Sequence, residues 1–578
     1  MAWGLLMIAA AAWAFTQRKR CATAGFVVQR PSTHSGTLFA HAQVRTTGQE
    51  RVMTRWIEAM QVAALPAQSM RRVELEGVPV LLVNAGTSSH PQDPQVRAFT
   101  ADCPHAGAPL EQGALCEGRI VCPWHKAAFA VENGQWLEPP ALEGLKTYPV
   151  RVESDAVFVD LEPERAAPQG PKQARPGPQR RIAIIGGGAA AAAAAATLLE
   201  VGFTGEVTMF AAEPQAPYDR TCLSKFVPAG EMKPGEVPAI LPEALTRDPR
   251  LRIEHREVTR FDVPTRQVTL ADGRQPAFDA VLIASGSVPV RPGIAGAELG
   301  RVFTLRTLAD AGGILEVLSL GDPAVILGDS FIGLETASAL RKRGVEVTIV
   351  APSGLPLQRA LGARVGGLMR DWHEAKGVVF RRAKAVRFVG DGNVESVELD
   401  DGRTVHAKAV IVGIGVRPAT QFLSGIELDE DGGVSVDSTM RAAPDVYAVG
   451  DIARFPLDSM AGSPGSAQKA RIEHWRVAQQ QARIAALNLL GENVRYEGVP
   501  FFWTQHYDKR LDYLGHAGNW DDMVISGRPG DERFGILYSQ QGQVQAVLAC
   551  GYEREMAFLS ERMRERLSTD EARTILGL

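Results

Sequence analysis

Two short cysteine–histidine motifs impose the strongest constraint on this chain of 578 residues. Each motif, C-P-H from residue 103 and C-P-W-H from residue 122, places one thiolate and one imidazole in a single short loop. A [2Fe-2S] cluster with two cysteines on one iron and two histidines on the other needs this ligand set. The alternative, a structural zinc site, usually has C-x₂₋₄-C and H-x₃₋₅-H spacings, which are absent here. The motifs therefore predict a cluster whose ligands are Cys103, His105, Cys122 and His125.

The sequence around both motifs resembles the Rieske ferredoxin family, in the segments CPHAGAPLEQG and CPWHKAAF. Alternating and apolar stretches at 72–83 and 150–161 predict short strands. We therefore expect an all-β Rieske [2Fe-2S] domain over residues 66–162. Respiratory-chain Rieske proteins carry an extra cysteine in each cluster loop, and this chain has none there. The resemblance thus implies the ferredoxin type that feeds oxygenases, with Cys116 as a structural residue.

Residues 163–180 have the sequence PERAAPQGPKQARPGPQR and predict a semi-extended linker. Before the Rieske-like segment, residues 1–65 are expected to form an N-terminal extension. The apolar stretch Trp3–Phe15 is shorter than the about 20 residues that span a bilayer, and its basic run follows it, unlike that of a signal peptide. A disordered extension, a misread start upstream of Met53 and a membrane anchor remain alternatives. We expect no membrane span and a cytoplasmic protein.

A second constraint begins at residue 181, where a buried-strand pattern runs into three glycines and eight alanines. Gly186, Gly188 and Ala191 fit G-x-G-x-x-G/A, a tight turn that lets the backbone approach a pyrophosphate. Alanine is the best helix former, so residues 189–196 predict a helix, with the phosphates at its N-terminus. Glu213 follows the next strand pattern, 206–210, where a carboxylate can bind a ribose. These features predict a dinucleotide-binding unit.

The segment PYDRTCLSK at 217–225 resembles the ferredoxin reductases of oxygenase systems and apoptosis-inducing-factor-like proteins. Further matches follow in order: GIGVRP at 413–418, VYAVGD at 446–451, EHW at 473–475 and VPFFWT at 499–504. Together with the Rieske-like segment, they identify the chain as a Rieske-fused, apoptosis-inducing-factor-like member of the FAD-dependent pyridine nucleotide-disulfide oxidoreductase superfamily. Disulfide reductases of that superfamily use a C-x₄-C pair, whereas Cys222 is alone. We therefore expect no redox disulfide.

The resemblance also implies roles for single residues. Lys225 should pair with Glu335 near the reactive edge of the flavin, as the catalytic residues, and Trp503 should pack beside the isoalloxazine. Asp451 should bind the ribityl chain of FAD. The implied cofactor-binding residues are Gly186, Gly188, Ala191, Glu213, Arg220, Lys225, Val258, Ser285, Gly328, Ile332, Gly333, Glu335, Gly413, Gly415, Asp451 and Trp503.

A second strand–turn–helix pattern follows the apolar stretch 324–327 and predicts the NAD(P)-binding unit. Ser330 replaces the middle glycine of its turn, where a side chain would crowd the pyrophosphate. The next strand, 345–350, is followed by Ala-Pro-Ser. An acidic residue there would indicate NADH and an arginine NADPH, so the sequence leaves both donors open.

The expected architecture is a multidomain chain: an all-β Rieske domain, α/β Rossmann-like domains for FAD and NAD(P), and a small α+β C-terminal domain. The expected boundaries after the linker are 181–300 with 426–500 for FAD, 301–425 for NAD(P) and 501–578 for the C-terminal domain. The formal net charge of −4 gives no electrostatic footprint for nucleic acid, and we expect no such partner. A homodimer stays open.

The expected function is transfer of electrons from NADH or NADPH through FAD to the fused cluster and on to a protein acceptor, an oxygenase or a cytochrome. The linker suggests that the Rieske domain swings between the flavin and that acceptor. The alternative function is a redox-sensing or regulatory protein with little turnover.

Overall fold

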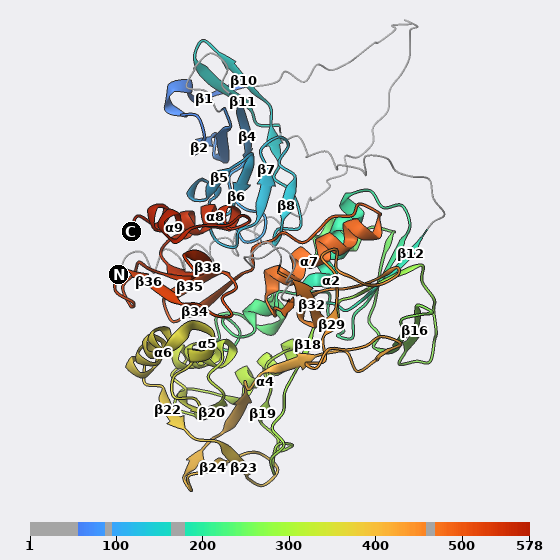
Figure 1. Cartoon of the computed structure of the whole chain (residues 1–578), viewed down its shortest axis with the longest axis vertical. Helices are drawn as coiled ribbons and strands as arrows, with labels where there is room; N and C mark the ends of the chain where they lie inside the picture. Colours follow the sequence, from blue (N-terminus) through green and yellow to red (C-terminus); the bar gives the residue numbers. More distant parts are fainter. Residues whose placement is uncertain (1–55, 87–94, 163–179, 458–468) are drawn as a thin grey trace, which may run out of the picture. The chain divides into compact units, whose positions relative to one another are not determined.

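The computed structural model describes residues 56–86, 95–162, 180–457 and 469–578. The stretch Trp3–Phe15, Met53 and all of the predicted linker except Arg180 lie outside them. The chain divides into two compact units, which are described separately: residues 1–111 with 146–165, and residues 112–145 with 166–578 (Figure 1). Within the described ranges, no helix has the length and apolar character needed to cross a membrane.

The first unit is built from β-strands. One sheet has the order β2-β3-β4-β9 and another the order β1-β11-β10. The short strands predicted within residues 72–83 are confirmed as parts of the antiparallel pair β2 and β3, which turns at Glu76 and Gly77, both with positive φ. The first strand starts at Trp56, before the expected boundary at residue 66. The strands are β1 (Trp56–Gln61), β2 (Ser69–Leu75), β3 (Val78–Asn84), β4 (Val96–Thr100), β9 (Thr147–Tyr148), β10 (Val150–Glu153) and β11 (Ala156–Asp160).

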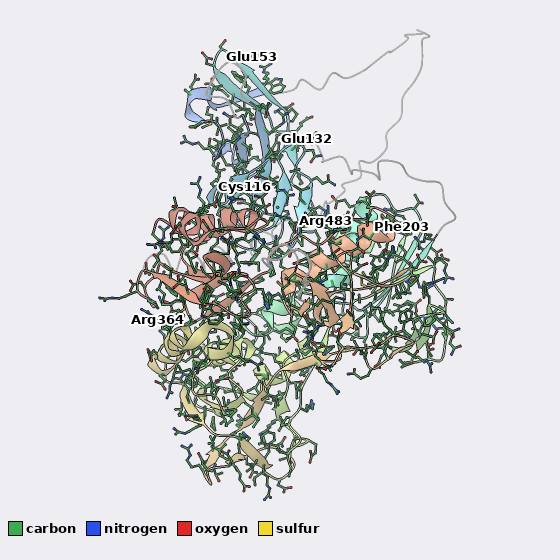
Figure 2. All side chains as sticks on the ribbon, in the orientation of Figure 1. Cys116, Glu132, Glu153, Phe203, Arg364 and Arg483 are labelled. Atoms are coloured by element: carbon green, nitrogen blue, oxygen red, sulfur yellow. The ribbon has the colours of Figure 1, made fainter. Side chains whose placement is uncertain are left out.

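Residues 112–145, which we call the cluster lobe, belong to the second unit. The lobe is an antiparallel sheet of β5 (Ala114–Cys116), β6 (Arg119–Val121), β7 (Ala128–Ala130) and β8 (Trp136–Glu138), in that order. Small apolar side chains of this sheet pack on Ala557 of α8 (Glu553–Arg562). Figure 2 labels Cys116 and Glu132 in this lobe. The cluster lobe therefore has its apolar contact with the C-terminal part of the chain.

The first α/β domain of the second unit has a sheet with the order β14-β13-β12-β17-β31-β30, parallel except at β30. The alanine tract forms α2 (Ala189–Glu200), and all eight alanines are buried. Their small side chains let α2 pack against α7 (Trp475–Leu489), which lies beside it in Figure 1. The strands are β12 (Arg181–Ile185), β13 (Glu206–Phe210), β14 (Leu251–Glu254), β17 (Ala280–Ile283), β30 (Arg441–Ala443) and β31 (Val446–Ala448).

The second α/β domain repeats this plan with a parallel sheet in the order β19-β26-β20-β21-β22. The predicted strand–turn–helix unit is confirmed as β20 followed by α5 (Phe331–Lys342). A longer helix, α6 (Gln358–Ala375), connects the next two strands. The strands are β19 (Val302–Phe303), β20 (Pro323–Leu327), β21 (Glu346–Ala351), β22 (Val379–Arg382) and β26 (Ala409–Val412).

The C-terminal domain is an antiparallel sheet in the order β34-β35-β38-β37-β36, followed by two helices. The two helices are α8, which ends at Arg562, and α9 (Thr569–Leu576). The observed elements confirm the α+β class of this domain. The strands are β34 (Phe501–His506), β35 (Lys509–Gly515), β36 (Asp522–Ser526), β37 (Phe534–Gln540) and β38 (Gln543–Cys550).

Candidate functional site

The turn after β12 has the backbone shape of a phosphate-binding loop. Gly186 has a φ of +138°, and a Cβ built on it would lie 2.1 Å from the carbonyl oxygen of Ala284. Gly188 is the N-cap of α2 without a side-chain cap, and a Cβ there would meet nothing within 4 Å. Ala191 is fully buried. The N-terminus of α2 is thus open to a phosphate group, and the turn fits a dinucleotide.

Glu213 lies after β13, at the position expected for a ribose-binding carboxylate. The Tyr218 hydroxyl donates to its Oε2 at 2.6 Å, and the Arg220 guanidinium pairs with Oε1. Arg220 also donates to the Arg306 carbonyl oxygen at 2.8 Å. Because a carboxylate has about four lone-pair sites, Glu213 keeps acceptor capacity for a ribose while it orders Arg220.

Asp451 stands on a short 3-10 turn, Gly450–Ile452, that follows β31. Its Oδ2 accepts a hydrogen bond from the Ser287 hydroxyl at 2.7 Å and lies 3.5 Å from Nη2 of Arg306. Two other predicted residues have structural contacts: Val258 is buried in β15 (Val258–Asp262), and the Ser285 hydroxyl donates to the Ala419 carbonyl oxygen.

Lys225 and Glu335 form the ion pair expected of the two catalytic residues. Lys225 Nζ lies 2.8 Å from Oε2 of Glu335, whose side chain is 3% exposed. Ser224 donates to the same oxygen at 2.5 Å, and Thr504 on β34 donates to Oε1 at 2.7 Å. Three segments far apart in sequence therefore meet at one carboxylate.

Sequence reasoning missed three members of this cluster: Ser224, Thr504 and His506. Nε2 of His506 lies 2.9 Å from the Thr504 hydroxyl, and burial, with a smaller contribution from the charge of Lys225, lowers its pKa to about 3. His506 is therefore neutral at ordinary pH and leaves the positive charge to Lys225. A signal was present, because Thr504 and His506 are two residues apart on a strand and so share one face.

In the second glycine-rich turn, after β20, Ser330 stands where the motif has its middle glycine, and its side chain is accommodated by hydrogen bonds within the turn. Ser330 is the N-cap of α5; its hydroxyl accepts from Gly333 N at 3.3 Å and donates to the Gly413 carbonyl oxygen at 3.0 Å. Gly328 has a φ of +95°, and a Cβ there would lie 2.4 Å from the same carbonyl oxygen. The serine side chain is thus bonded inside the turn. Gly415 has a positive φ and Ile332 is 43% exposed at the start of α5.

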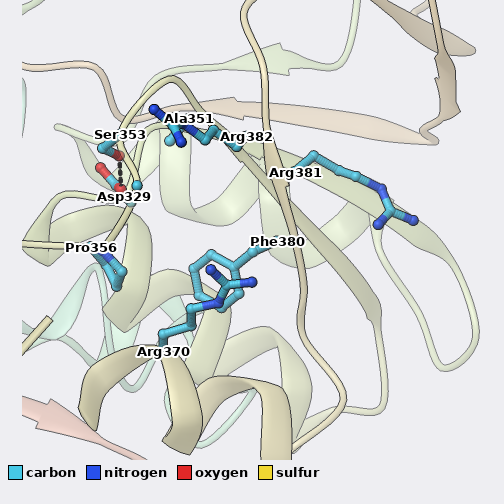
Figure 3. A pocket seen from close by; sticks show the side chains of 9 residues that line it. Asp329, Ala351, Ser353, Pro356, Arg370, Phe380, Arg381 and Arg382 are labelled. Carbon is cyan, nitrogen blue, oxygen red and sulfur yellow. Dashed lines mark hydrogen bonds between the residues drawn. The ribbon is translucent and has the colours of Figure 1, made fainter. Parts of the chain in front are cut away.

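A pocket lies where β21 ends, the usual place for the adenosine ribose of a dinucleotide (Figure 3). Ser353 donates to Asp329, and both residues line the pocket. Three arginines from α6 and β22 also line it, although no arginine follows β21 directly in the sequence. The pocket therefore contains both an acidic side chain and cations. The arginines are Arg370, Arg381 and Arg382.

The two cysteine–histidine loops share one backbone design. In the first, Cys103 N donates to Ala108 O and Gly107 N donates to Cys103 O, both at 2.8 Å. In the second, Cys122 N donates to Ala127 O at 2.8 Å and Lys126 N to Cys122 O at 3.2 Å. The residue four positions after each cysteine has a positive φ, +74° in the first loop and +60° in the second. The paired thiolate and imidazole in each loop fit one half of a cluster site.

His125, in the second of these loops, contacts an aromatic residue of the C-terminal domain. The centroids of the His125 and Trp503 rings are 4.3 Å apart, with 52° between the ring planes. Trp503 also lies beside the Lys225–Glu335 pair, because Lys225 Nζ is 5.9 Å from the centroid of its ring. Trp503 therefore contacts both the cluster lobe and the predicted flavin site.

Residues 180–482 match the family model described as pyridine nucleotide-disulphide oxidoreductase. The chain belongs to this family. Residues 55–149 match the Rieske [2Fe-2S] domain and residues 501–575 the reductase C-terminal domain. As a Rieske-fused member of the pyridine nucleotide-disulphide oxidoreductases, the protein is an oxidoreductase that uses FAD, NAD(P)H and a [2Fe-2S] cluster.

Named relatives share this combination or its reductase part. The chain is 32% identical to human apoptosis-inducing factor 3 over 507 residues, 85% of this chain and 81% of that protein. It is 35% identical over 391 residues to the ferredoxin–NAD(+) reductase component of the biphenyl dioxygenase system of Paraburkholderia xenovorans, 67% of this chain and 94% of that one. The crystal structure of a covalent putidaredoxin reductase–putidaredoxin complex superposes with a TM-score of 0.63 at 27% identity, covering 68% of this chain and 94% of that chain.

Cys222 differs from the redox cysteines that disulfide reductases of this oxidoreductase superfamily use. Its thiol is buried and forms no disulfide. Burial raises the pKa of this thiol, so the reactive thiolate is disfavoured. Burial likewise raises the pKa of Cys116, to about 12. Both observations agree with structural roles for these two cysteines.

The carboxyl group of Glu200, at the end of α2, predicts that the stability of this oxidoreductase depends on pH. Burial raises the pKa of its carboxyl group to about 7, against smaller opposite effects of Arg483, Trp136 and Gln135. Because this value lies above the ordinary 4.5, the folded state binds more protons between these pH values. Stability should therefore fall as the pH rises from about 4.5 to about 7. Figure 2 labels Arg483.

We expect Glu200→Gln to remove this slope and to raise the free energy of unfolding at about pH 8 by about 1–3 kcal/mol. Urea unfolding at about pH 5 and about pH 8 measures the difference. Glu206→Gln, at an exposed carboxylate on β13, is the matched control and should leave the slope unchanged. Equal slopes in the wild type and Glu200→Gln would contradict the prediction.

Proposed function

We propose that this protein oxidises NADH or NADPH and delivers the electrons, through its own Rieske cluster, to a separate protein acceptor such as an oxygenase or a cytochrome. The observation that carries the proposal is the contact of His125 with Trp503, beside the Lys225–Glu335 pair. Bound FAD would supply the ability to take up a hydride, and the cluster would supply the release of its two electrons one at a time. The proton that remains from the hydride would be lost to solvent.

The protein's own residues position these groups. The open N-terminus of α2 receives the FAD pyrophosphate, and the Ser287-supported carboxylate of Asp451 accepts from the ribityl chain. Lys225, held by Glu335, places a positive charge at the flavin site. These roles are those that the FAD-binding family assigns to the matching motifs, and the local geometry supports them.

The cluster ligands in this proposal are the thiolates of Cys103 and Cys122 and the imidazoles of His105 and His125. Cys103 and Cys122 are 2% and 1% exposed, so the thiolates are shielded from water and oxidants. Imidazole ligands carry less negative charge than thiolates and raise the reduction potential of the cluster. A cluster of this kind can take electrons from a reduced flavin.

An anaerobic titration tests the proposal. The protein, purified with its FAD and cluster, is titrated with NADH and, separately, with NADPH while the visible spectrum and the EPR signal are recorded. Bleaching of the flavin followed by the signal of a reduced, histidine-ligated [2Fe-2S] cluster is expected. A bleached flavin with a cluster that stays oxidised would overturn the transfer and favour a sensing role with little turnover.

A further inference from the structure

Lys126 occupies a backbone position that favours glycine. It is the fourth residue after Cys122 and has a φ of +60°, while Gly107 has the matching place in the other loop. A side chain in this left-handed region is unfavourable by about 1 kcal/mol or more, whereas glycine adopts it freely. The cluster loop therefore carries a lysine at a place where its own folding is better served by glycine.

The side chain of Lys126 is fully buried, although lysine is rarely buried without a partner. Its ammonium donates to Oδ2 of Asp512 at 2.9 Å and to the Pro123 carbonyl oxygen at 2.5 Å, and it lies 5.1 Å from the centroid of the Phe501 ring. Asp512 is on β35, and its Oδ1 accepts from Arg510 at 2.8 Å. The lysine thus links the cluster loop to the C-terminal sheet that also carries Trp503.

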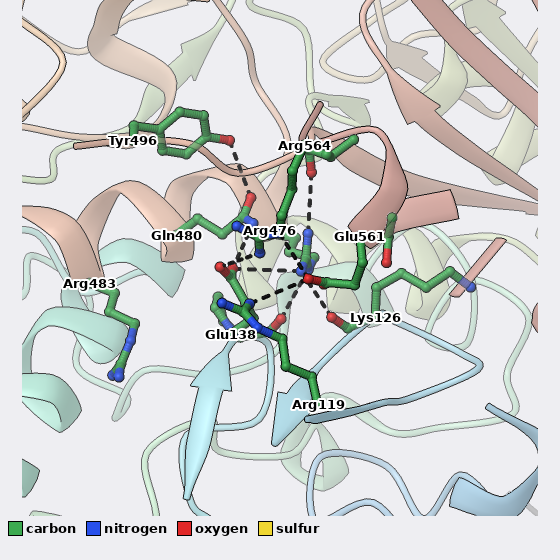
Figure 4. A network of polar contacts seen from close by, with 12 residues as sticks. Arg119, Lys126, Glu138, Arg476, Gln480, Arg483, Tyr496, Glu561 and Arg564 are labelled. Carbon is green, nitrogen blue, oxygen red and sulfur yellow. Dashed lines mark hydrogen bonds and ion pairs between the residues drawn. The ribbon is translucent and has the colours of Figure 1, made fainter. Parts of the chain in front are cut away.

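Further polar contacts connect the cluster lobe with α7 and with the segment after α8 (Figure 4). Arg476 of α7, 2% exposed, donates to the backbone carbonyls of Lys126 and Pro139. Glu138 of β8 pairs with Arg564 at 2.8 Å and accepts from Gln480 at 2.7 Å. Buried ion pairs need a defined geometry to offset their desolvation, so this network fixes one arrangement of the lobe.

We propose that Lys126 and Asp512 form a positioning pair that seats the second cluster loop on the reductase, with His125 held against Trp503. On this proposal each electron leaves the flavin site and reaches the cluster within the folded chain, across this contact. The external acceptor takes the two electrons in turn and so reoxidises the cluster. The inference rests on the proposed function. It predicts that the cluster is reduced while this loop stays seated on the reductase.

Lys126→Gly in the full-length protein separates seating from folding. Glycine fits the left-handed backbone, so the loop and its cluster should form normally, while the link to Asp512 is lost. Stopped-flow mixing with NAD(P)H should give an unchanged rate of flavin bleaching. The rate of the next step, reduction of the cluster, should fall on the order of tenfold. This is the fall expected if the population with His125 seated against Trp503 drops from about nine-tenths to about one-tenth. Asp512→Asn, which keeps the side-chain shape, should also lower the rate of cluster reduction and leave the rate of flavin bleaching unchanged.

Two further readouts distinguish positioning from a merely structural role. Iron content and the EPR g values of the reduced cluster should match the wild type in Lys126→Gly. Hydrogen exchange should rise in residues 122–127 and around Asp512. The matched control is Glu117→Gly, which makes the same kind of replacement at a positive φ in the same lobe, at an exposed residue. This control should leave the rates of flavin bleaching and of cluster reduction unchanged.

The outcomes are separable from those of the proposed function. A wild-type protein whose cluster is never reduced by NAD(P)H would refute the proposed function itself. A wild-type protein that reduces its cluster, with Lys126→Gly and Asp512→Asn equally fast and equally protected from exchange, would refute the positioning pair alone. Loss of iron from Lys126→Gly, together with wild-type rates in Asp512→Asn, would also overturn it, because Lys126 would then serve the fold of the loop.

Discussion

Gly186→Ala is expected to yield a protein without bound FAD. The added Cβ would stand 2.1 Å from the carbonyl oxygen of Ala284, and the φ of +138° is one that side chains rarely adopt. The turn must shift, at a cost of about 1–3 kcal/mol in stability. A shift that removes about 3 kcal/mol of FAD binding lowers the affinity on the order of 100-fold. The flavin absorbance per polypeptide after gel filtration measures the loss.

Gly188→Ala is the matched control for this turn. Its φ is −103°, and the new methyl group meets no protein atom within 4 Å. The stability of the apoprotein should therefore stay close to that of the wild type. Any loss of FAD in this variant would then come from contact between the methyl group and the cofactor itself. Gly186→Ala with a full complement of FAD would contradict the assignment of this turn to the FAD pyrophosphate.

Local patterns in the sequence were sufficient for the elements that depend on neighbouring residues. The strand–glycine–alanine pattern from residue 181 predicted β12 and α2, and the structure has both there. Apolar periodicity and helix propensity act over a few residues, so they can be recognised without knowledge of the fold. The Lys225–Glu335 pair came from the family resemblance instead, since its members are 110 residues apart.

Contacts between distant segments were beyond the reach of those patterns. Lys126 and Asp512 are separated by 386 residues, and a lone lysine in a sequence indicates an exposed side chain. Whether Ser330 crowds the pyrophosphate stays a prediction, but the sequence did not show that its hydroxyl donates to the carbonyl oxygen of Gly413, which follows strand β26. In each case the partner that decides the behaviour of the side chain is supplied by tertiary structure.

The packing partners of the Rieske domain are also supplied by distant segments, so the sequence could not indicate them. The two cysteine–histidine motifs predicted a Rieske domain over 66–162, and residues 55–149 match that family, but the motifs did not indicate that the cluster lobe packs on α8. The apolar faces of such short strands are too small to indicate their partner from sequence alone. The predicted linker lies almost entirely outside the described residues, so the expected swing of the Rieske domain stays a prediction.

Cys122→Ala is expected to remove the cluster while leaving the flavin half of the reaction intact. Cys122 supplies one of the two thiolates in the proposed ligand set, and its backbone bonds within the loop do not depend on the sulfur. Removal of a residue that only supports a metal ligand already lowers metal affinity or activity by about 10–100-fold. Reduction of a cluster-dependent protein acceptor should therefore fall by at least ~100-fold, and the EPR signal of the reduced cluster should disappear.

Cys116→Ala supplies the control, because this buried cysteine of β5 lies in the same lobe but outside both motifs. It should keep its iron, its EPR signal and its acceptor reduction. In both variants, NAD(P)H should bleach the flavin at the wild-type rate, since the FAD turn and the Lys225–Glu335 pair are untouched. If Cys122→Ala retained the reduced cluster signal, the ligand set would be wrong. If it lost the cluster yet reduced the acceptor normally, electrons would leave the flavin by another route, and the contact between His125 and Trp503 would have no part in turnover.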